Sequence, residues 1–144
     1  MKHRPRQHLI SGWTVIELLI ALVVAAVLVA IAVPSYQSHI KRSQRADGVA
    51  ALLNVQTAQE KFFLQTGVYS ASLTEGPPAG LGLAKLSPQG HYAVEISVSA
   101  PSAYTAKAVR VSTDTRCVEL TLNQNGLRQA RDAQGKDTTE DCWR

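Results

Sequence analysis

Residues 12–34 read GWTVIELLIALVVAAVLVAIAVP, and this stretch decides how the rest of the chain is organised. It is almost entirely apolar over about twenty residues, the length that a helix needs to span a bilayer. One acid, Glu17, lies near its start. A carboxylate within a membrane-spanning helix costs about 2.5–3.5 kcal/mol on insertion scales. Glu17 is therefore either a chance acid or a residue on which the function of the segment depends.

The residues before this stretch are basic, and they predict its orientation. Lys2, Arg4 and Arg6 precede Gly12 with no acid between them. Basic residues beside an apolar helix stay cytoplasmic, so we expect the N-terminus inside and the C-terminal part outside. The same three residues account for most of the net charge of +4, since without them twelve basic residues face eleven acidic ones. The high pI is therefore weak evidence for nucleic acid as a partner.

Two kinds of processing fit the N-terminus. A signal peptidase that recognises small residues would cut after Ala32 and release a soluble protein that begins at Val33. Cleavage after Gly12 would instead leave Trp13 as the first residue and keep the apolar helix. The second alternative is favoured by the glycine at the junction and by the unbroken helical pattern up to Pro34.

The run Gly12-WTVIELL resembles the leader junction of type IV pilins and of the pseudopilins of type II secretion. The resemblance implies that a prepilin peptidase cuts after Gly12 and methylates the amine of Trp13, a position where the family usually has Phe. Glu17 then becomes the fifth mature residue, and Pro34, followed by Ser35-Tyr36, matches the family as well. The closing stretches LTLNQNG and DCWR look most like minor pilins of the PilE type.

The resemblance also implies a role for Glu17. In a packed fibre of such helices, its carboxylate can meet the amine of Trp13 on a neighbouring subunit, and each charge then favours the ionised form of the other. Removing one partner of a buried ion pair costs about 3–5 kcal/mol, so Glu17 would fix the register between subunits. The alternative is an interfacial acid with no partner.

Helical patterning continues beyond Pro34, and it predicts one helix over residues 13–65, about 80 Å long. Its first part is apolar on all sides, and its second part is amphipathic, with Pro34 and Gly48 as expected bend points. We expect three regions: a cleaved leader at 1–12, an apolar transmembrane and fibre-core helix at 13–40, and a periplasmic or extracellular head at 41–144. The basic residues Lys41, Arg42 and Arg45 are expected on a solvated helix face, or else against other subunits or lipid headgroups.

The remaining chain predicts a small antiparallel sheet. Residues 67–89 are rich in Gly, Pro and Ser and form a long loop. Alternating apolar residues then predict strands at residues 92–98, 104–112 and 117–122, and a short fourth strand follows the turn at 123–126, over residues 127–130. The fold class is therefore α+β, with the sheet packed on the long helix.

The two cysteines, Cys117 and Cys142, predict one disulfide, because the N-terminus indicates export to an oxidising compartment. Closing a loop of this size is worth about 3.5 kcal/mol in the chain-entropy model. The alternative is a pair of free thiols in a cytoplasmic protein. The pairing also matches the C-terminal disulfide loop of the pilins.

No grouping of residues predicts catalysis, a cofactor or a metal. The sequence has no CxxC or HxxxH spacing and no calcium-loop order of acids, and its Ser and Thr residues have no His and acid arranged near them. We therefore predict that the chain is not an enzyme.

The main functional hypothesis, which rests on the resemblance, is a structural and minor subunit of a type IV pilus, supporting pilus biogenesis, twitching motility or adhesion. Its partners would be other pilin subunits, the inner-membrane assembly platform and the prepilin peptidase. It would lie in the inner membrane before assembly and in the extracellular fibre afterwards. The alternatives are a type II secretion pseudopilin, a pilus-tip module for DNA uptake or surface attachment, and a plain secreted domain.

Overall fold

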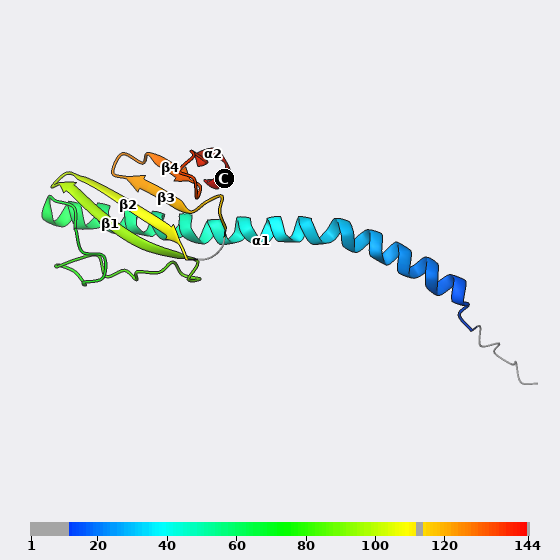
Figure 1. The fold of residues 1–144 in the computed structure, drawn as a ribbon. Helices are drawn as coiled ribbons and strands as arrows, with labels where there is room; N and C mark the ends of the chain where they lie inside the picture. Colours follow the sequence, from blue (N-terminus) through cyan, green and yellow to red (C-terminus); the bar gives the residue numbers. More distant parts are fainter. Residues whose placement is uncertain (1–11, 112–113, 144) are drawn as a thin grey trace, which may run out of the picture. The chain divides into compact units, whose positions relative to one another are not determined.

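The computed structural model describes residues 12–111 and 114–143 (Figure 1). The elements follow the order α1 (Val15–Thr66), β1 (Tyr92–Ala100), β2 (Ala103–Arg110), β3 (Glu119–Asn123), β4 (Arg128–Arg131) and α2 (Thr139–Cys142). The chain divides into two compact units between Ser38 and His39, within α1. We call the unit that begins at His39 the head. The predicted α+β fold is confirmed, with one long helix and a four-stranded antiparallel sheet.

The first unit is a helix whose side chains all face outward. Every described residue from Gly12 to Ser43 is exposed. Within this part of α1, an 18-residue window has a mean hydropathy of 3.1, which is apolar enough to cross a membrane. The helix continues through Pro34, which lacks the N–H that would bond to the carbonyl of Ala30. The predicted bend at Pro34 stays a prediction.

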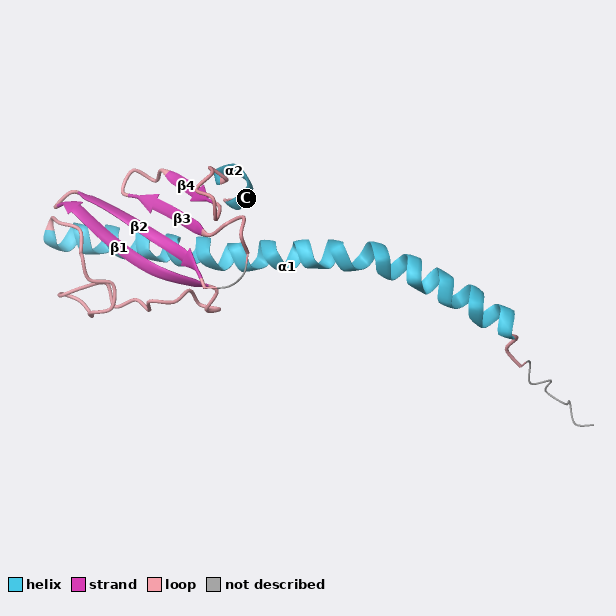
Figure 2. Ribbon diagram, viewed as in Figure 1, coloured by secondary structure: helices cyan, strands magenta, loops and turns pink. Residues whose placement is uncertain are grey.

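In the head, one side of α1 packs against the sheet, as the ribbon coloured by secondary structure illustrates (Figure 2). Leu52 and Val55 of α1 are buried in one cluster with inward-facing residues of all four strands. The main strand residues of this cluster are Tyr92, Val94, Tyr104, Ala106, Ala108, Leu120, Leu122 and Ala130. Burying these apolar side chains, at about 25 cal/mol per Å², is the main force that holds the sheet on the helix.

The strands lie in sequence order, β1-β2-β3-β4, and each neighbouring pair is antiparallel. In β1 the expected alternation is present, since Tyr92 and Val94 are buried whereas Glu95 and Ser97 are exposed. The bounds of all four strands differ from the prediction by up to two residues, and residue 112, the predicted end of the second strand, lies outside the described residues. The third strand begins at Glu119, and the fourth covers Arg128–Arg131 and leaves Leu127 exposed in the turn. The short helix α2 was not predicted.

Three polar residues of α1 that the pattern places on its solvated side lie at or near the core. Asp47 and Gln59 are buried, and the guanidinium of Arg45 forms an ion pair with Asp114 across 3.1 Å. The expectation of a solvated face is therefore wrong for Arg45. Lys41 and Arg42 are exposed within the single chain, so their contact with solvent, other subunits or lipid headgroups stays a prediction. A hydrophobicity pattern misses such residues because it cannot locate a partner that lies 69 positions away.

Gly48 has a packing reason to be glycine. A Cβ atom at this position would lie 2.7–2.9 Å from ring carbons of Tyr92. Real Cβ atoms do not approach so closely, so α1 and the start of β1 can pack at this distance only with glycine there. The structure thus gives Gly48 a role in contact between helix and sheet, which the sequence could not reveal.

The long loop between α1 and β1 is held to the helix at two points. Near its start, the Gln59 amide donates to the Ser70 carbonyl at 2.7 Å and accepts from the Ser70 N–H at 2.9 Å. Near its end, the Asp47 carboxylate accepts from the Ser87 hydroxyl and from the N–H groups of Gln89 and His91. These bonds satisfy buried polar groups that would otherwise be costly.

Candidate assembly helix and C-terminal disulfide region

The N-terminus of α1 is capped by the residues around the predicted processing site. The Thr14 hydroxyl accepts a hydrogen bond from the Glu17 N–H at 3.3 Å, and the Thr14 carbonyl accepts from the same N–H at 3.1 Å. Thr14 is thus an N-cap, and Glu17 is the acid three residues later that helix N-termini favour. Gly12 and Trp13 lie just before this cap and are exposed.

The side chain of Glu17 has no hydrogen bond or ion pair with any residue that the structure describes. Its carboxylate is exposed in the first turn of α1, beside Trp13, whose side chain is 71% exposed. Within one chain, then, the only local support for Glu17 is the favourable field of the helix N-terminus. Its carboxylate remains available for a partner outside the chain.

The apolar surface that follows is far larger than soluble monomers normally expose. Between Trp13 and Ile40, sixteen large apolar side chains are exposed: Trp13, Val15, Ile16, Leu18, Leu19, Ile20, Leu22, Val23, Val24, Val27, Leu28, Val29, Ile31, Val33, Tyr36 and Ile40. They surround the helix rather than forming one stripe. A helix that is apolar all round needs a membrane or neighbouring helices to cover it.

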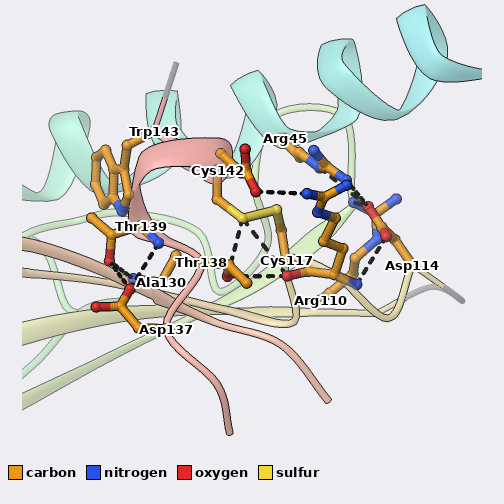
Figure 3. Close-up of a disulfide and its surroundings, with 12 residues drawn as sticks. Arg45, Arg110, Asp114, Cys117, Ala130, Asp137, Thr138, Thr139, Cys142 and Trp143 are labelled. Carbon is orange, nitrogen blue, oxygen red and sulfur yellow. Dashed lines mark hydrogen bonds and ion pairs between the residues drawn. A yellow bond between two sulfur atoms is a disulfide. The ribbon is translucent and has the colours of Figure 1, made fainter. Parts of the chain in front are cut away.

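The predicted disulfide between Cys117 and Cys142 is confirmed. It joins the residues just before β3 to the end of α2, and both sulfur-bearing residues are buried (Figure 3). Around it, the Thr138 hydroxyl donates to the Arg116 carbonyl at 3.1 Å, and the Arg116 guanidinium forms an exposed ion pair with Asp141 at 2.7 Å. The disulfide thus holds the C-terminal segment against the sheet.

The C-terminal segment also covers the outer edge of β4. The Thr139 hydroxyl accepts from the Ala130 N–H at 2.9 Å, and the indole N–H of Trp143 donates to the Gln129 carbonyl at 2.9 Å. The Arg128 guanidinium lies 5.3 Å from the centre of the Trp143 ring, a cation–π contact. These contacts leave no long unpaired edge at β4, which protects the sheet from unwanted pairing.

A buried ionic cluster lies on the other side of the disulfide and joins α1 to the sheet (Figure 3). Asp114 pairs with Arg45 at 3.1 Å and with Arg110 at 3.6 Å, and its side chain is 5% exposed. Burial alone would raise the pKa of Asp114, but hydrogen bonds from the Arg116 N–H and the Arg45 guanidinium outweigh burial and lower it. The carboxylate therefore stays ionised.

Tyr92 completes this cluster. Its hydroxyl donates to the Cys117 carbonyl at 3.0 Å and accepts from the Arg110 guanidinium at 3.2 Å. Burial raises the pKa of Tyr92, and the neighbouring Arg110 opposes part of that rise. The hydroxyl thus links the ionic cluster to the backbone beside the disulfide.

Of the sequence-predicted site residues, the structure brings Gly12, Trp13 and Glu17 together at one helix end and joins the two cysteines. Sequence reasoning missed Thr14, although the order Thr-x-x-Glu before an apolar run is a recognised capping signal. It also missed the role of Arg110. The alternation with Tyr104, Ala106 and Ala108 puts Arg110 on the inward face of β2, where a charged side chain needs a partner. Nothing in the sequence indicated that Asp114 would neutralise it there.

The chain resembles a known protein family and several individual proteins. A family model described as "Type IV minor pilin ComP, DNA uptake sequence receptor" matches residues 34–121. The chain is 28% identical over 89 residues to a type IV major pilin protein PilE1 of Neisseria gonorrhoeae, covering 62% of this chain and 40% of that protein. A second PilE1 of that organism is 25% identical over 126 residues, or 88% of this chain and 59% of the relative.

Fimbrial protein EcpC of Eikenella corrodens is 32% identical over 90 residues, which cover 62% of this chain and 55% of EcpC. In these three alignments the chain matches between 40% and 59% of the relative's length. The family model covers residues 34–121, so it includes the second part of α1, β1, β2 and the start of β3. It leaves out most of the apolar helix as well as β4 and α2.

Proposed function

The chain belongs to the type IV minor pilin family that this model describes, and on that premise we propose that it is a structural subunit of a type IV pilus. It polymerises through the apolar segment 13–40, which is anchored in the inner membrane before assembly and lies in the fibre core afterwards. Its role is structural rather than catalytic. The observation that carries the proposal is the exposed apolar surface of this segment, which is joined to a head with its own core.

The proposal includes processing at Gly12. Cleavage there leaves the Thr14 cap and Glu17 within five residues of the new N-terminus, so an amine and a carboxylate lie at the same helix end. Two subunits that are offset along the fibre can then pair the Trp13 amine of one with Glu17 of the other. Sequencing the N-terminus of the mature protein tests this step, since methylated Trp13 supports it and Val33 refutes it.

The assembly role is tested by Glu17→Gln, which removes the charge and keeps the shape of the side chain. Because the helix cap uses the backbone N–H of residue 17, we expect normal processing and normal membrane anchoring. Loss of an ion pair worth about 3 kcal/mol lowers incorporation by about a hundredfold. The amount of the subunit in sheared fibres, relative to membranes, measures the effect.

Glu75→Gln is the matched control, because Glu75 is an exposed acid in the loop of the head. It leaves incorporation unchanged if the effect is specific to Glu17. Normal incorporation of the Glu17→Gln subunit would show that the carboxylate does not fix the register.

DNA reception is the second candidate function, because the description of the family model names it. The observation that favours it is the Arg128 guanidinium over the Trp143 ring, a cation beside an aromatic side chain. Binding of duplex DNA that weakens steeply with salt and is reduced by Arg128→Ala would support it. Equal binding by the wild-type and Arg128→Ala proteins would remove this site from consideration.

A further inference from the structure

The face of the sheet that points away from α1 carries a polar trough. It crosses β2, β3 and β4 and has a cavity volume of about 140 Å³. Its lining consists of Thr105, Glu119, Thr121, Gln129, Ala130 and Arg131. None of the functions considered above uses this face, because polymerisation takes place through α1 and the candidate DNA contact lies at the β4 edge.

The strand register brings these side chains together. Thr121 lies directly opposite Gln129, and Glu119 lies directly opposite Arg131. Lys107 is also opposite Thr121, but its ammonium forms an ion pair with Glu95 at 3.6 Å, so it is held toward β1. Among the described residues, the side chains of Thr105, Thr121 and Gln129 have no hydrogen-bond partner, so their polar groups are available to a ligand.

The chemistry of the lining selects the class of ligand. Hydroxyl and amide groups both donate and accept, the Glu119 carboxylate only accepts, and the Arg131 guanidinium only donates. The two charged pairs on this face, Glu119 with Arg131 and Glu95 with Lys107, are each neutral in sum. A polyanion gains nothing from such a surface, because its affinity depends on an excess of Lys and Arg contacts.

We propose that this trough binds a neutral, hydroxyl-rich ligand, namely one sugar unit of a surface glycan. The trough has room for about one sugar ring. None of its lining residues is aromatic, so no ring stacking strengthens the interaction. Hydrogen bonds alone give a weak interaction, with a dissociation constant on the order of millimolar.

The experiment uses the full chain in micelles of lauryldimethylamine oxide, a detergent that has no sugar headgroup. Saturation-transfer difference NMR is recorded with maltotriose, chitotriose and lactose as probes. Thr121→Val removes one hydroxyl and keeps the shape that a strand favours, and Glu119→Gln removes the acceptor charge. Glu95→Gln is the matched control, because Glu95 lies on the same face but outside the trough.

We expect saturation transfer to at least one of the three sugars, reduced about tenfold by Thr121→Val and by Glu119→Gln, and unchanged by Glu95→Gln. Thermal unfolding of each variant confirms that the head is intact. Absence of transfer to all three sugars, or equal transfer with Thr121→Val, would overturn the proposal. The proposal would also be overturned if duplex DNA displaced the sugar from the wild-type protein and Thr121→Val abolished the binding of DNA. That result would assign the trough to nucleic acid. None of these results depends on fibre incorporation, which tests the pilus role separately.

Discussion

Gly48 illustrates how one absent side chain sets the distance between a helix and a sheet. The Tyr92 ring against it is buried and is held through its hydroxyl by Cys117 and Arg110. In Gly48→Ala the new Cβ displaces this ring, at about 1–3 kcal/mol for overpacking. Alanine has a higher helix propensity than glycine, which stabilises the helix by only about 1 kcal/mol. We therefore expect urea unfolding to show a net loss of stability.

The exposed residue Ala50, on the same helix, provides the comparison for this prediction. Ala50→Gly reports propensity alone and should cost about 1 kcal/mol. Should Gly48→Ala stabilise the head by a similar amount, the Tyr92 ring moves without cost and the packing argument for glycine fails.

Asp114 matters at the same scale because two guanidinium groups depend on it. Asp114→Asn leaves Arg45 and the 2%-exposed side chain of Arg110 without their carboxylate, a loss of about 3–5 kcal/mol for a buried pair. Since the folded pKa lies below the ordinary 3.8, the wild-type stabilisation is complete above pH 3.8 and disappears as the pH falls through the folded pKa.

The free energy of unfolding of the wild type should therefore fall between about pH 5 and pH 2 by more than that of Asp114→Asn. Urea titrations of both proteins across this range measure the difference. Parallel pH curves for the two proteins would mean that the cluster does not couple to ionisation of Asp114.

At the scale of elements, the loop between α1 and β1 behaves as two separately anchored halves. Gln59 holds the part around Ser70, and Asp47 holds the part from Ser87 to His91. Gln59→Met keeps the volume but leaves the buried N–H and carbonyl of Ser70 unpaired, which costs about 1–3 kcal/mol. We expect faster amide hydrogen exchange at residues 67–73 and no change at residues 87–91.

The reciprocal variant is Asp47→Asn, which should speed exchange at residues 87–91 and leave residues 67–73 protected. If either variant speeds amide hydrogen exchange in both halves of the loop, the loop opens as one cooperative unit. The distinction matters because a loop that is anchored in halves lets one half adapt to a neighbouring subunit without releasing the other.

Across the whole molecule, the sequence predicts what depends on local patterns. Apolar runs, period-two alternation and turn residues were enough for α1, the four strands and the fold class. The predicted export and the presence of two cysteines were enough to predict the disulfide. The ionic cluster, the buried anchors Asp47 and Gln59 and the reason for Gly48 depend on pairs that lie 11 to 69 positions apart. Such partners meet only after the chain folds, so no local window contains the information.

Among the described residues, the disulfide is the only covalent cross-link between side chains, and it ties residues 137–143 to the segment before β3. Removing it with Cys117→Ser and Cys142→Ser lowers stability by about 3.5 kcal/mol in the chain-entropy model, a large share of the roughly 5–15 kcal/mol that domains possess. The disulfide lies outside the apolar segment 13–40, so the stability of that segment and its membrane anchoring should not change. We therefore expect normal processing and anchoring of the double variant, with increased proteolysis of the head and fewer subunits in fibres.

Limited proteolysis and urea unfolding of the oxidised wild type and the double variant distinguish this outcome from a specific assembly defect. If lost stability is the cause, growth at lower temperature restores both protease resistance and incorporation together. Incorporation that stays low while the head resists protease would place the disulfide region in a contact between subunits. Unchanged stability would instead mean that the bonds of Thr138, Thr139 and Trp143 hold the segment without the cross-link.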